Sequence, residues 1–281
     1  MKDKVIIFGA AGTGQKIYKQ VKDKEDVLFF AENNSKLWGT EIDGVKVISP
    51  EKLLELDFDF IHVGSMVGLA AITEQLVKMG IPRYKMKNEL ALVQTRSRVL
   101  FLEDFAKIAY ERNYQGAVAE AGVYRGAYSK EINRCFPDRT LYLFDTFEGF
   151  PETDVAAEKK SSHTNAVADY LKDTSVDLVL SNMPIREKCV VKKGFFPDTA
   201  KGLEEKFVYV SLDMDLYKPT LEGLRYFYPR IVRGGVIAIH DFFSDAYPNI
   251  KQSVYEYEEE LGTKLSLCPI GDDISIAIVK S

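Results

Sequence analysis

Two short, almost wholly apolar runs in this chain end abruptly in charged or imidazole side chains. Val208–Leu212 is followed by Asp213 and Asp215 with Met214 between them, and Val236–Ile239 is followed by His240–Asp241. Runs of this kind are typical of strands that are buried on both faces of a parallel sheet. Because the carboxyl ends of adjacent parallel strands open into the ligand crevice of such a sheet, these polar side chains are expected to meet there. The two runs therefore predict an α/β fold with a metal or proton-transfer site at the sheet edge.

Strand and helix patterns alternate along the whole chain, which predicts right-handed crossovers between parallel strands. The first series contains four apolar runs read as strands: Val5–Phe8, Val27–Phe30, Val45–Ile48 and Phe60–Val63. A second series begins with a helix expected at Val99–Arg112. We expect two doubly wound Rossmann-like domains, residues 1–95 and 96–281. The second should end in a β-hairpin formed by Leu265–Cys268 and Ile274–Val279.

Composition narrows the class of protein. The chain has 281 residues, 46% of them hydrophobic, and a net charge of −5, which offers no electrostatic reason to bind nucleic acid. The three cysteines are scattered without metal-site spacing, so we expect neither disulfides nor a zinc knuckle, and a reducing, cytoplasmic location. No apolar run reaches the ~20 residues of a membrane helix, and the N-terminus reads as a strand rather than a signal peptide. We also expect a homo-oligomer.

The first glycine-rich turn, Gly9–Gly14, lies between a predicted strand and a predicted helix. Backbone N–H groups in such a turn can bind a phosphate, and Glu32 at the end of the next strand is a candidate ribose ligand. The alternative is a tight turn used for packing or oligomerisation. Residues 30–50 resemble the N-terminal domains of some sugar-modifying acyltransferases. This resemblance points to sugar metabolism. A separate alternative for the protein is a non-catalytic module, a scaffold whose first domain reads a nucleotide or tethers the protein in an assembly.

A second strand–turn–helix, with Glu120 ahead of Gly122 and Gly126, carries a different arrangement. The carboxylate can pair with the ammonium group of a ligand, while the glycines let the backbone approach closely. Asp145 ends the following predicted strand, where an acid can accept hydrogen bonds from two ribose hydroxyls. The combination resembles class I S-adenosylmethionine-dependent methyltransferases, whose cofactor carries both an amino-acid group and a ribose.

The resemblance sharpens to macrocin-type sugar O-methyltransferases and covers residues 116–281. It rests on five motifs: Glu120–Ala127, Tyr142–Pro151, Gly194–Thr199, Leu212–Thr220 and Gly234–Asp241. It implies S-adenosylmethionine as methyl donor, a divalent metal (usually Mg²⁺) and a sugar-containing small molecule as acceptor. In the family's terms Glu120, Gly122 and Asp145 bind the cofactor, with Phe195 near its adenine. The aspartate pair Asp213 and Asp215 binds metal and activates the acceptor.

Carboxylate oxygens are the ligands that Mg²⁺ prefers, and Asp213, Asp215 and Asp241 would supply them. A bound Mg²⁺ would lower the pKa of a sugar hydroxyl. Asp215 is our candidate general base. The same Asp213–Asp215 spacing also fits the DxD motif of a metal-dependent glycosyltransferase, although that chemistry has no use for Glu120.

The role of His240 is open at this point. Imidazole suits Zn²⁺, Mn²⁺ or Fe²⁺ better than Mg²⁺. The ring could also act as the general base, including in an enzyme that uses no metal. Alternatively, it could hydrogen-bond a metal-bound water, or be a buried structural histidine. The polar segment 152–183 is expected to hold one or two helices and to form a substrate loop that contains His163. His62 is expected to be structural.

Overall fold

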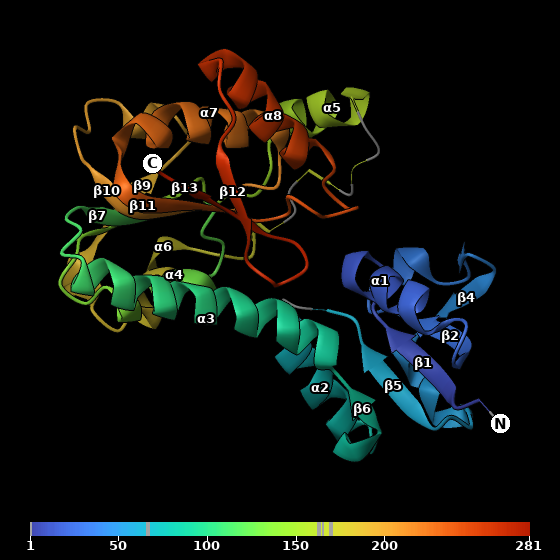
Figure 1. Ribbon diagram of the computed structural model, residues 1–281. Helices are drawn as coiled ribbons and strands as arrows, with labels where there is room; N and C mark the ends of the chain where they lie inside the picture. Colours follow the sequence, from blue (N-terminus) through green and yellow to red (C-terminus); the bar gives the residue numbers. More distant parts are fainter. Residues whose placement is uncertain (1, 66–67, 162–163, 165, 169–170) are drawn as a thin grey trace. The chain divides into compact units, whose positions relative to one another are not determined.

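The computed structural model describes residues 2–281 except 66–67, 162–163, 165 and 169–170 (Figure 1). The chain divides into two compact units, Met1–Arg96 and Ser97–Ser281. Each unit is built on a mainly parallel β-sheet, so the α/β prediction is confirmed. In the part of the chain described, no helix is long and apolar enough to cross a membrane.

The boundary between the units falls inside one helix, α3 (Glu89–Glu111). The prediction that this helix starts at Val99 is wrong. No glycine or proline interrupts the segment, and the polar residues near Thr95 continue the helix. The Thr95 hydroxyl donates to the Ala91 carbonyl at 2.9 Å, which is compatible with helical backbone.

The first unit has a six-stranded sheet in the order β3-β4-β2-β1-β5-β6, parallel apart from its β3 edge. Apolar side chains of α1 and α2 pack against it. The elements are β1 (Lys4–Phe8), α1 (Gly12–Val21), β2 (Asp26–Ala31), β3 (Glu41–Ile42), β4 (Val45–Ile48), β5 (Phe60–Val63), α2 (Leu69–Lys78) and β6 (Met86–Lys87), with 3-10 helices at Ser35–Leu37, Pro50–Glu55 and Arg83–Lys85.

The second unit has a seven-stranded sheet in the order β12-β13-β11-β10-β7-β8-β9. The five strands β11, β10, β7, β8 and β9 are parallel to one another. The hairpin β12–β13 adds two antiparallel strands next to β11 at one edge of the sheet, as predicted from the sequence. The strands are β7 (Ala117–Ala121), β8 (Leu141–Asp145), β9 (Cys189–Lys193), β10 (Phe207–Leu212), β11 (Ile231–Ile239), β12 (Ser266–Pro269) and β13 (Ile276–Val279).

Helices cover both faces of this sheet (Figure 1). Buried side chains of α7 and α8 pack on one face, and those of α3, α4 and α6 pack on the other. The remaining helix, α5, lies in the segment that follows β8. The helices are α4 (Ala127–Cys135), α5 (Glu152–Ser161), α6 (Val176–Asn182), α7 (Tyr217–Phe227) and α8 (Asn249–Leu261), with 3-10 helices at Arg186–Lys188, Asp198–Ala200 and Tyr228–Arg230.

Strand β7 is the point where the strand order reverses. The chain runs outward from β7 through β8 to β9, then crosses back to β10 on the other side of β7. In open α/β sheets, ligands bind beyond the carboxyl ends of the strands at such a switch point. Here that edge carries Glu120 near the end of β7 and Asp213 directly after β10.

Candidate functional site

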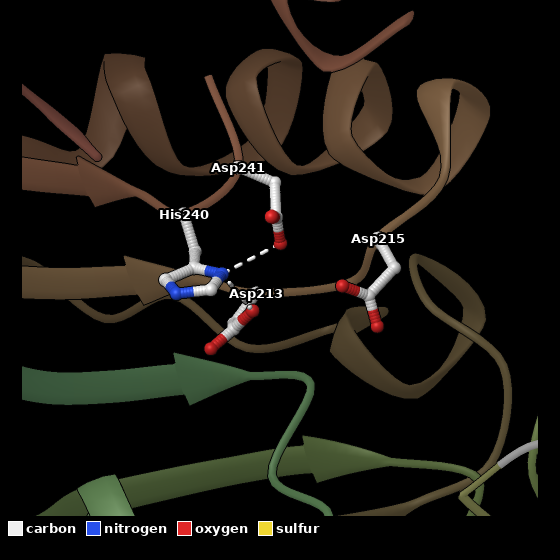
Figure 2. A group of neighbouring side chains, drawn as sticks. All are labelled: Asp213, Asp215, His240 and Asp241. Atoms are coloured by element: carbon white, nitrogen blue, oxygen red, sulfur yellow. Dashed lines mark hydrogen bonds and ion pairs between the residues drawn. The ribbon is translucent and has the colours of Figure 1, made fainter. Parts of the chain in front are cut away.

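Four of the residues singled out in the sequence come together at this edge. One potential ligand atom from each of Asp213, Asp215, His240 and Asp241 lies within 4.8 Å of all the others. Figure 2 shows their side chains converging from the ends of β10 and β11, with His240 Nδ1 facing the carboxylates of Asp213 and Asp241. We call these four residues the acid cluster.

The backbone at the strand ends turns the side chains into the cluster. Asp215 and Asp241 both have a φ of 60°, in the left-handed region that few residues other than glycine adopt. Two backbone hydrogen bonds tie the neighbouring residues to the sheet. Asp213 N donates to Ala121 O at 2.8 Å, and His240 N donates to Leu212 O at 2.9 Å. Such left-handed residues cost free energy and are common at functional sites.

His240 is buried and paired with two carboxylates. Its Nδ1 atom lies 2.6 Å from Asp241 Oδ2 and 3.1 Å from Asp213 Oδ1. Burial opposes a charge on the ring, but the charges of Asp213 and Asp241 outweigh burial and raise the pKa of His240 well above its ordinary value. The ring therefore holds its proton between two carboxylates, which differs from a histidine that is merely buried in an apolar core.

Asp213 is also held by a residue that the sequence did not reveal, Arg98 of α3. Arg98 Nη1 donates to Asp213 Oδ2 and Nη2 donates to Ser211 Oγ, both at 2.9 Å. The guanidinium lies 3.8 Å from the ring centroid of Tyr128, a cation–π contact. Burial alone would raise the pKa of Asp213, yet His240 and Arg98 together hold it well below the ordinary value.

Asp215 stands in a surplus of negative charge. Burial, and then the charges of Asp241 and Asp213, raise its pKa well above the ordinary value. A divalent cation among these oxygens would relieve the repulsion, and three carboxylates are suitable hard ligands. The donor set of the acid cluster therefore fits a divalent metal ion.

Glu120 lies beside the acid cluster, near the end of β7, and is almost fully buried. It accepts a hydrogen bond from the Ser129 hydroxyl. Burial raises the pKa of Glu120 to about 8, although Arg98 and Ser129 act in the opposite direction. The side chain that was expected to meet a ligand's ammonium group is thus covered, with Ser129 as its partner.

The glycines of the second turn have tight packing roles. Gly122 has a φ of 87°, and a Cβ atom there would lie 1.8 Å from Asp213 O. Gly126 has a φ of 76° and precedes α4, where a Cβ would lie 3.0 Å from side-chain atoms of Val179 and Met183. The turn after β7 and the start of the acid cluster are therefore in direct backbone contact.

Asp145, at the end of β8, supports the same turn. Its Oδ2 accepts from Val123 N at 2.6 Å and from Tyr124 N at 2.9 Å, and its Oδ1 accepts from Phe147 N at 2.7 Å. Gly194 N donates to Asp145 O at 2.9 Å, which brings the loop carrying Phe195 against this strand end.

Phe195 is 54% exposed, so its ring is available to a ligand. Its neighbour Phe196 points into the core, where its ring stacks on Phe227 at a centroid distance of 5.4 Å. Of these two adjacent aromatic residues, Phe195 therefore lies at the surface and Phe196 packs in the core.

The segment after β8 is tied to the site at two places. Arg125 Nε donates to Asp173 O at 2.9 Å, which fixes part of the segment over the glycine turn. Glu158 of α5 is buried and accepts from Tyr217 N at 3.1 Å and from Asn249 Nδ2 at 2.9 Å, at the starts of α7 and α8. Sequence analysis missed Glu158, which looks like any acid of a polar helix. His163 lies outside the described residues.

The glycine turn of the first unit is closely packed. A Cβ on Gly14 would lie 1.9 Å from Gly9 O. The Glu32 carboxylate accepts from Ala10 N at 2.9 Å and from Asn34 N at 3.0 Å. This geometry accounts for the glycines as a tight turn, and nucleotide binding here stays a prediction. His62 Nε2 lies 2.6 Å from Glu25 Oε2 in the same unit.

Comparison with known proteins bears on the whole chain. The model of the family described as Macrocin-O-methyltransferase (TylF) matches residues 89–275, and a model described as C2185-like, N-terminal, matches residues 1–87. Mycinamicin III 3''-O-methyltransferase of Micromonospora griseorubida is 26% identical over 219 residues, which cover 73% of this chain and 83% of the relative.

A second relative, from Streptomyces olivaceus, is 26% identical over 159 residues, which cover 52% of this chain and 59% of the relative. It is the 8-demethyl-8-(2,3-dimethoxy-alpha-L-rhamnosyl)-tetracenomycin-C 4'-O-methyltransferase. The solved structure of the O-methyltransferase NovP superposes with a TM-score of 0.55 at 24% identity, covering 66% of this chain and 80% of that one. This likeness shows the class I methyltransferase fold that the sequence predicted. The family match extends over the glycine turn, α3 and the acid cluster, and the chain belongs to the macrocin O-methyltransferase (TylF) family.

Proposed function

We propose that this protein is an S-adenosylmethionine-dependent, divalent-metal-assisted O-methyltransferase that acts on a sugar hydroxyl. The observation that carries the proposal is the backbone contact between the two turns at the switch point. Asp213 N donates to Ala121 O at 2.8 Å, and Gly122 leaves no room for a side chain. A cofactor over the turn after β7 would thus lie next to an acceptor hydroxyl over the acid cluster, and proximity of this kind supplies much of the rate in group transfer.

On the cofactor side, the backbone of Gly122 and Gly126 would let S-adenosylmethionine approach. Asp145 stands at the adjacent strand end, where its oxygens can also accept from ribose hydroxyls. Glu120 would support the amino-acid end of the cofactor, and the exposed ring of Phe195 would contact the adenine. When bound, S-adenosylmethionine supplies an electrophilic methyl group for attack by the acceptor oxygen.

On the acceptor side, Asp213, Asp215 and Asp241 would hold the metal, with Mg²⁺ the best fit to three carboxylates. When bound, such a metal lowers the pKa of an acceptor hydroxyl. Arg98 holds one oxygen of Asp213 in place, and His240 holds the other. The chain's own residues therefore orient the ligand set before anything binds.

Asp215 is the proposed general base. Its carboxylate belongs to the cluster that would hold the metal, so it would lie within reach of the acceptor hydroxyl and could take up the proton of that hydroxyl. His240 would hold Asp213 and Asp241 through its Nδ1 proton and stabilise the charge that develops on the cluster.

The sugar acceptor is supported by the names of the relatives. The relative from Streptomyces olivaceus is named for a rhamnosyl group on tetracenomycin, and the family is named for macrocin. We therefore propose a sugar-containing small molecule as the acceptor. The glycosyltransferase alternative finds no support in the family match.

Calorimetry tests the proposal. We expect S-adenosylhomocysteine to bind the full chain and a panel of nucleotide sugars to compete poorly with it. With rhamnosylated polyketides as acceptors, methyl transfer should be lost on chelation with EDTA and restored by Mg²⁺. Binding of nucleotide sugars without S-adenosylhomocysteine would overturn the methyltransferase proposal. Full activity after chelation would overturn its metal component alone.

A further inference from the structure

Three buried side-chain atoms that the proposed chemistry does not use have no hydrogen-bond partner among the described residues: His240 Nε2, Asp272 Oδ2 and Ser275 Oγ. His240 belongs to the end of β11, and the other two belong to the turn between β12 and β13. Buried polar atoms in native proteins almost always have a partner, so these three call for an explanation.

Strand register brings the turn to His240. Strands β11 and β13 are antiparallel, with Ala238 opposite Ala277 and Ile239 opposite Ile276, so Ser275 stands opposite His240. Alternate residues share a face, and both alanines pack in the core on the α3 side of the sheet. The side chains of His240 and Ser275 are therefore expected on that same face.

The chain after the acid cluster closes the other side of this group. Phe243 N donates to Ile274 O at 3.0 Å, which holds the turn against the residues that follow Asp241. Asp272 has no exposed surface, and its Oδ1 accepts from Ile274 N at 3.1 Å and from Ser275 N at 2.7 Å. One oxygen of this carboxylate thus shapes the turn, while the second is left for another partner.

Leaving a carboxylate oxygen buried and unpaired destabilises the folded state, because the oxygen loses its hydrogen bonds to water without replacing them. We infer that Asp272 and Ser275 hold an internal water that accepts a hydrogen bond from His240 Nε2 and donates to Asp272 Oδ2 and Ser275 Oγ. Such a water makes three hydrogen bonds, the usual number for a buried water, and satisfies all three atoms at once. Asp272 is then a positioning residue, which keeps the imidazole turned so that Nδ1 faces Asp213 and Asp241.

The arrangement has a chemical logic. Imidazoles that serve a metal site or a proton acceptor commonly donate their second N–H to a carboxylate, directly or through water, and this fixes the ring orientation. Any effect of this ring orientation on methyl transfer rests on the proposed function. The hydrogen bonding of the His240 ring is independent of that function and can be measured on the protein alone.

Imidazole NMR gives the direct test, because the chain has only three histidines. In protein labelled with ¹⁵N-histidine, His240 is assigned from the signal lost in His240→Gln. Asp272→Asn keeps an oxygen for the backbone donors of the turn but replaces Oδ2 with an NH₂ group that cannot accept. Ser275→Ala removes the other proposed partner. Asp273→Asn, at the exposed neighbour, is the matched control.

We expect a slowly exchanging Nε2 proton on His240 in the wild type and in Asp273→Asn. In Asp272→Asn, and to a smaller extent in Ser275→Ala, this proton should exchange roughly tenfold faster, the change that corresponds to the loss of one hydrogen bond. Unchanged His240 signals in both variants would overturn the inference, whether or not methyl transfer is ever detected. If the variants unfold instead, a wild-type Nε2 proton in fast exchange would overturn it equally.

Discussion

Arg98 and Asp213 lie 115 positions apart in the chain, and Arg98 Nη1 donates a hydrogen bond to Asp213 Oδ2 at 2.9 Å. The pair joins helix α3 to the end of strand β10 at the sheet edge that carries the acid cluster. Both charges lie largely out of solvent, and the Arg98 guanidinium is nearly fully buried. Removing one member of such a pair leaves the other uncompensated.

Replacing Arg98 by Met should lower the free energy of unfolding by about 3 kcal/mol or more at pH 7, measured by urea unfolding. Arg96→Met is the matched control, since Arg96 is exposed on the same helix, and it should change stability by less than about 0.5 kcal/mol. Equal effects of the two substitutions would contradict a special role for Arg98.

The same variant should be more sensitive to acid. The depressed pKa of Asp213 contributes stability above its unfolded pKa of about 3.9, and this contribution is lost as the pH falls toward the folded value. Without Arg98 the folded pKa rises, so unfolding in acid should begin at a higher pH. Circular dichroism across an acid titration checks this. Coincident titrations of variant and wild type would count against the pairing.

Asp215→Asn tests the proposed base. Turnover should fall by about 10²-fold or more, because general-base catalysis contributes on that scale. The affinity for S-adenosylhomocysteine should change little, since the cofactor would contact the turn after β7 rather than Asp215. Steady-state kinetics and calorimetry on the same preparation give both values. An equal loss of cofactor binding would remove the role assigned to Asp215.

Gly122→Ala tests the contact between the two turns. Both Gly122 and Gly202 have positive φ, but a Cβ on Gly122 would lie 1.8 Å from Asp213 O, whereas a Cβ on Gly202 meets nothing within 4 Å. Gly202→Ala should therefore report backbone strain alone, about 1 kcal/mol. Gly122→Ala should cost clearly more in the same urea assay and should disturb the acid cluster. Similar costs at both sites would argue against the close contact.

Glu120 should give the protein a distinctive pH dependence. Its pKa is raised to about 8 in the folded state, so between the unfolded value near 4.3 and pH 8 the folded state binds more protons than the unfolded state. This residue should therefore make stability fall as the pH rises through that window. Glu120→Gln, which can still accept from Ser129, should flatten the profile measured by urea unfolding from pH 5 to 9. Parallel profiles for the two proteins would refute the raised pKa.

Much of the fold follows from short-range pattern. Buried strands such as Phe60–Val63 were found to the residue, because an apolar run between turn residues has few other interpretations. The acid cluster was also predictable, since strand order follows from crossovers and strand ends share an edge. We expected Asp213, Asp215, His240 and Asp241 to lie close together, and one ligand atom of each lies within 4.8 Å of the others.

Other parts carry no local signal. Arg98 looks like one more basic residue of a helix, and only the packing of α3 against β10 reveals its partner. The start of α3 at Glu89 was not predicted for a related reason. Polar residues such as those near Thr95 occur both in linkers and on the exposed face of a helix, so they favour neither structure. The partners of a side chain depend on contacts between segments that are distant in the sequence, and the spacing of residues along the chain does not predict these contacts.

The link made by Glu158 has a practical consequence. One buried carboxylate joins α5 to the first residues of α7 and α8, and Val155 and Leu216 pack beside it. Exposed positions of α5 can then vary in sequence while this anchor stays in place. An engineer who wants to change the acceptor range of the proposed methyltransferase should therefore keep Glu158 and exchange exposed side chains of α5 around it.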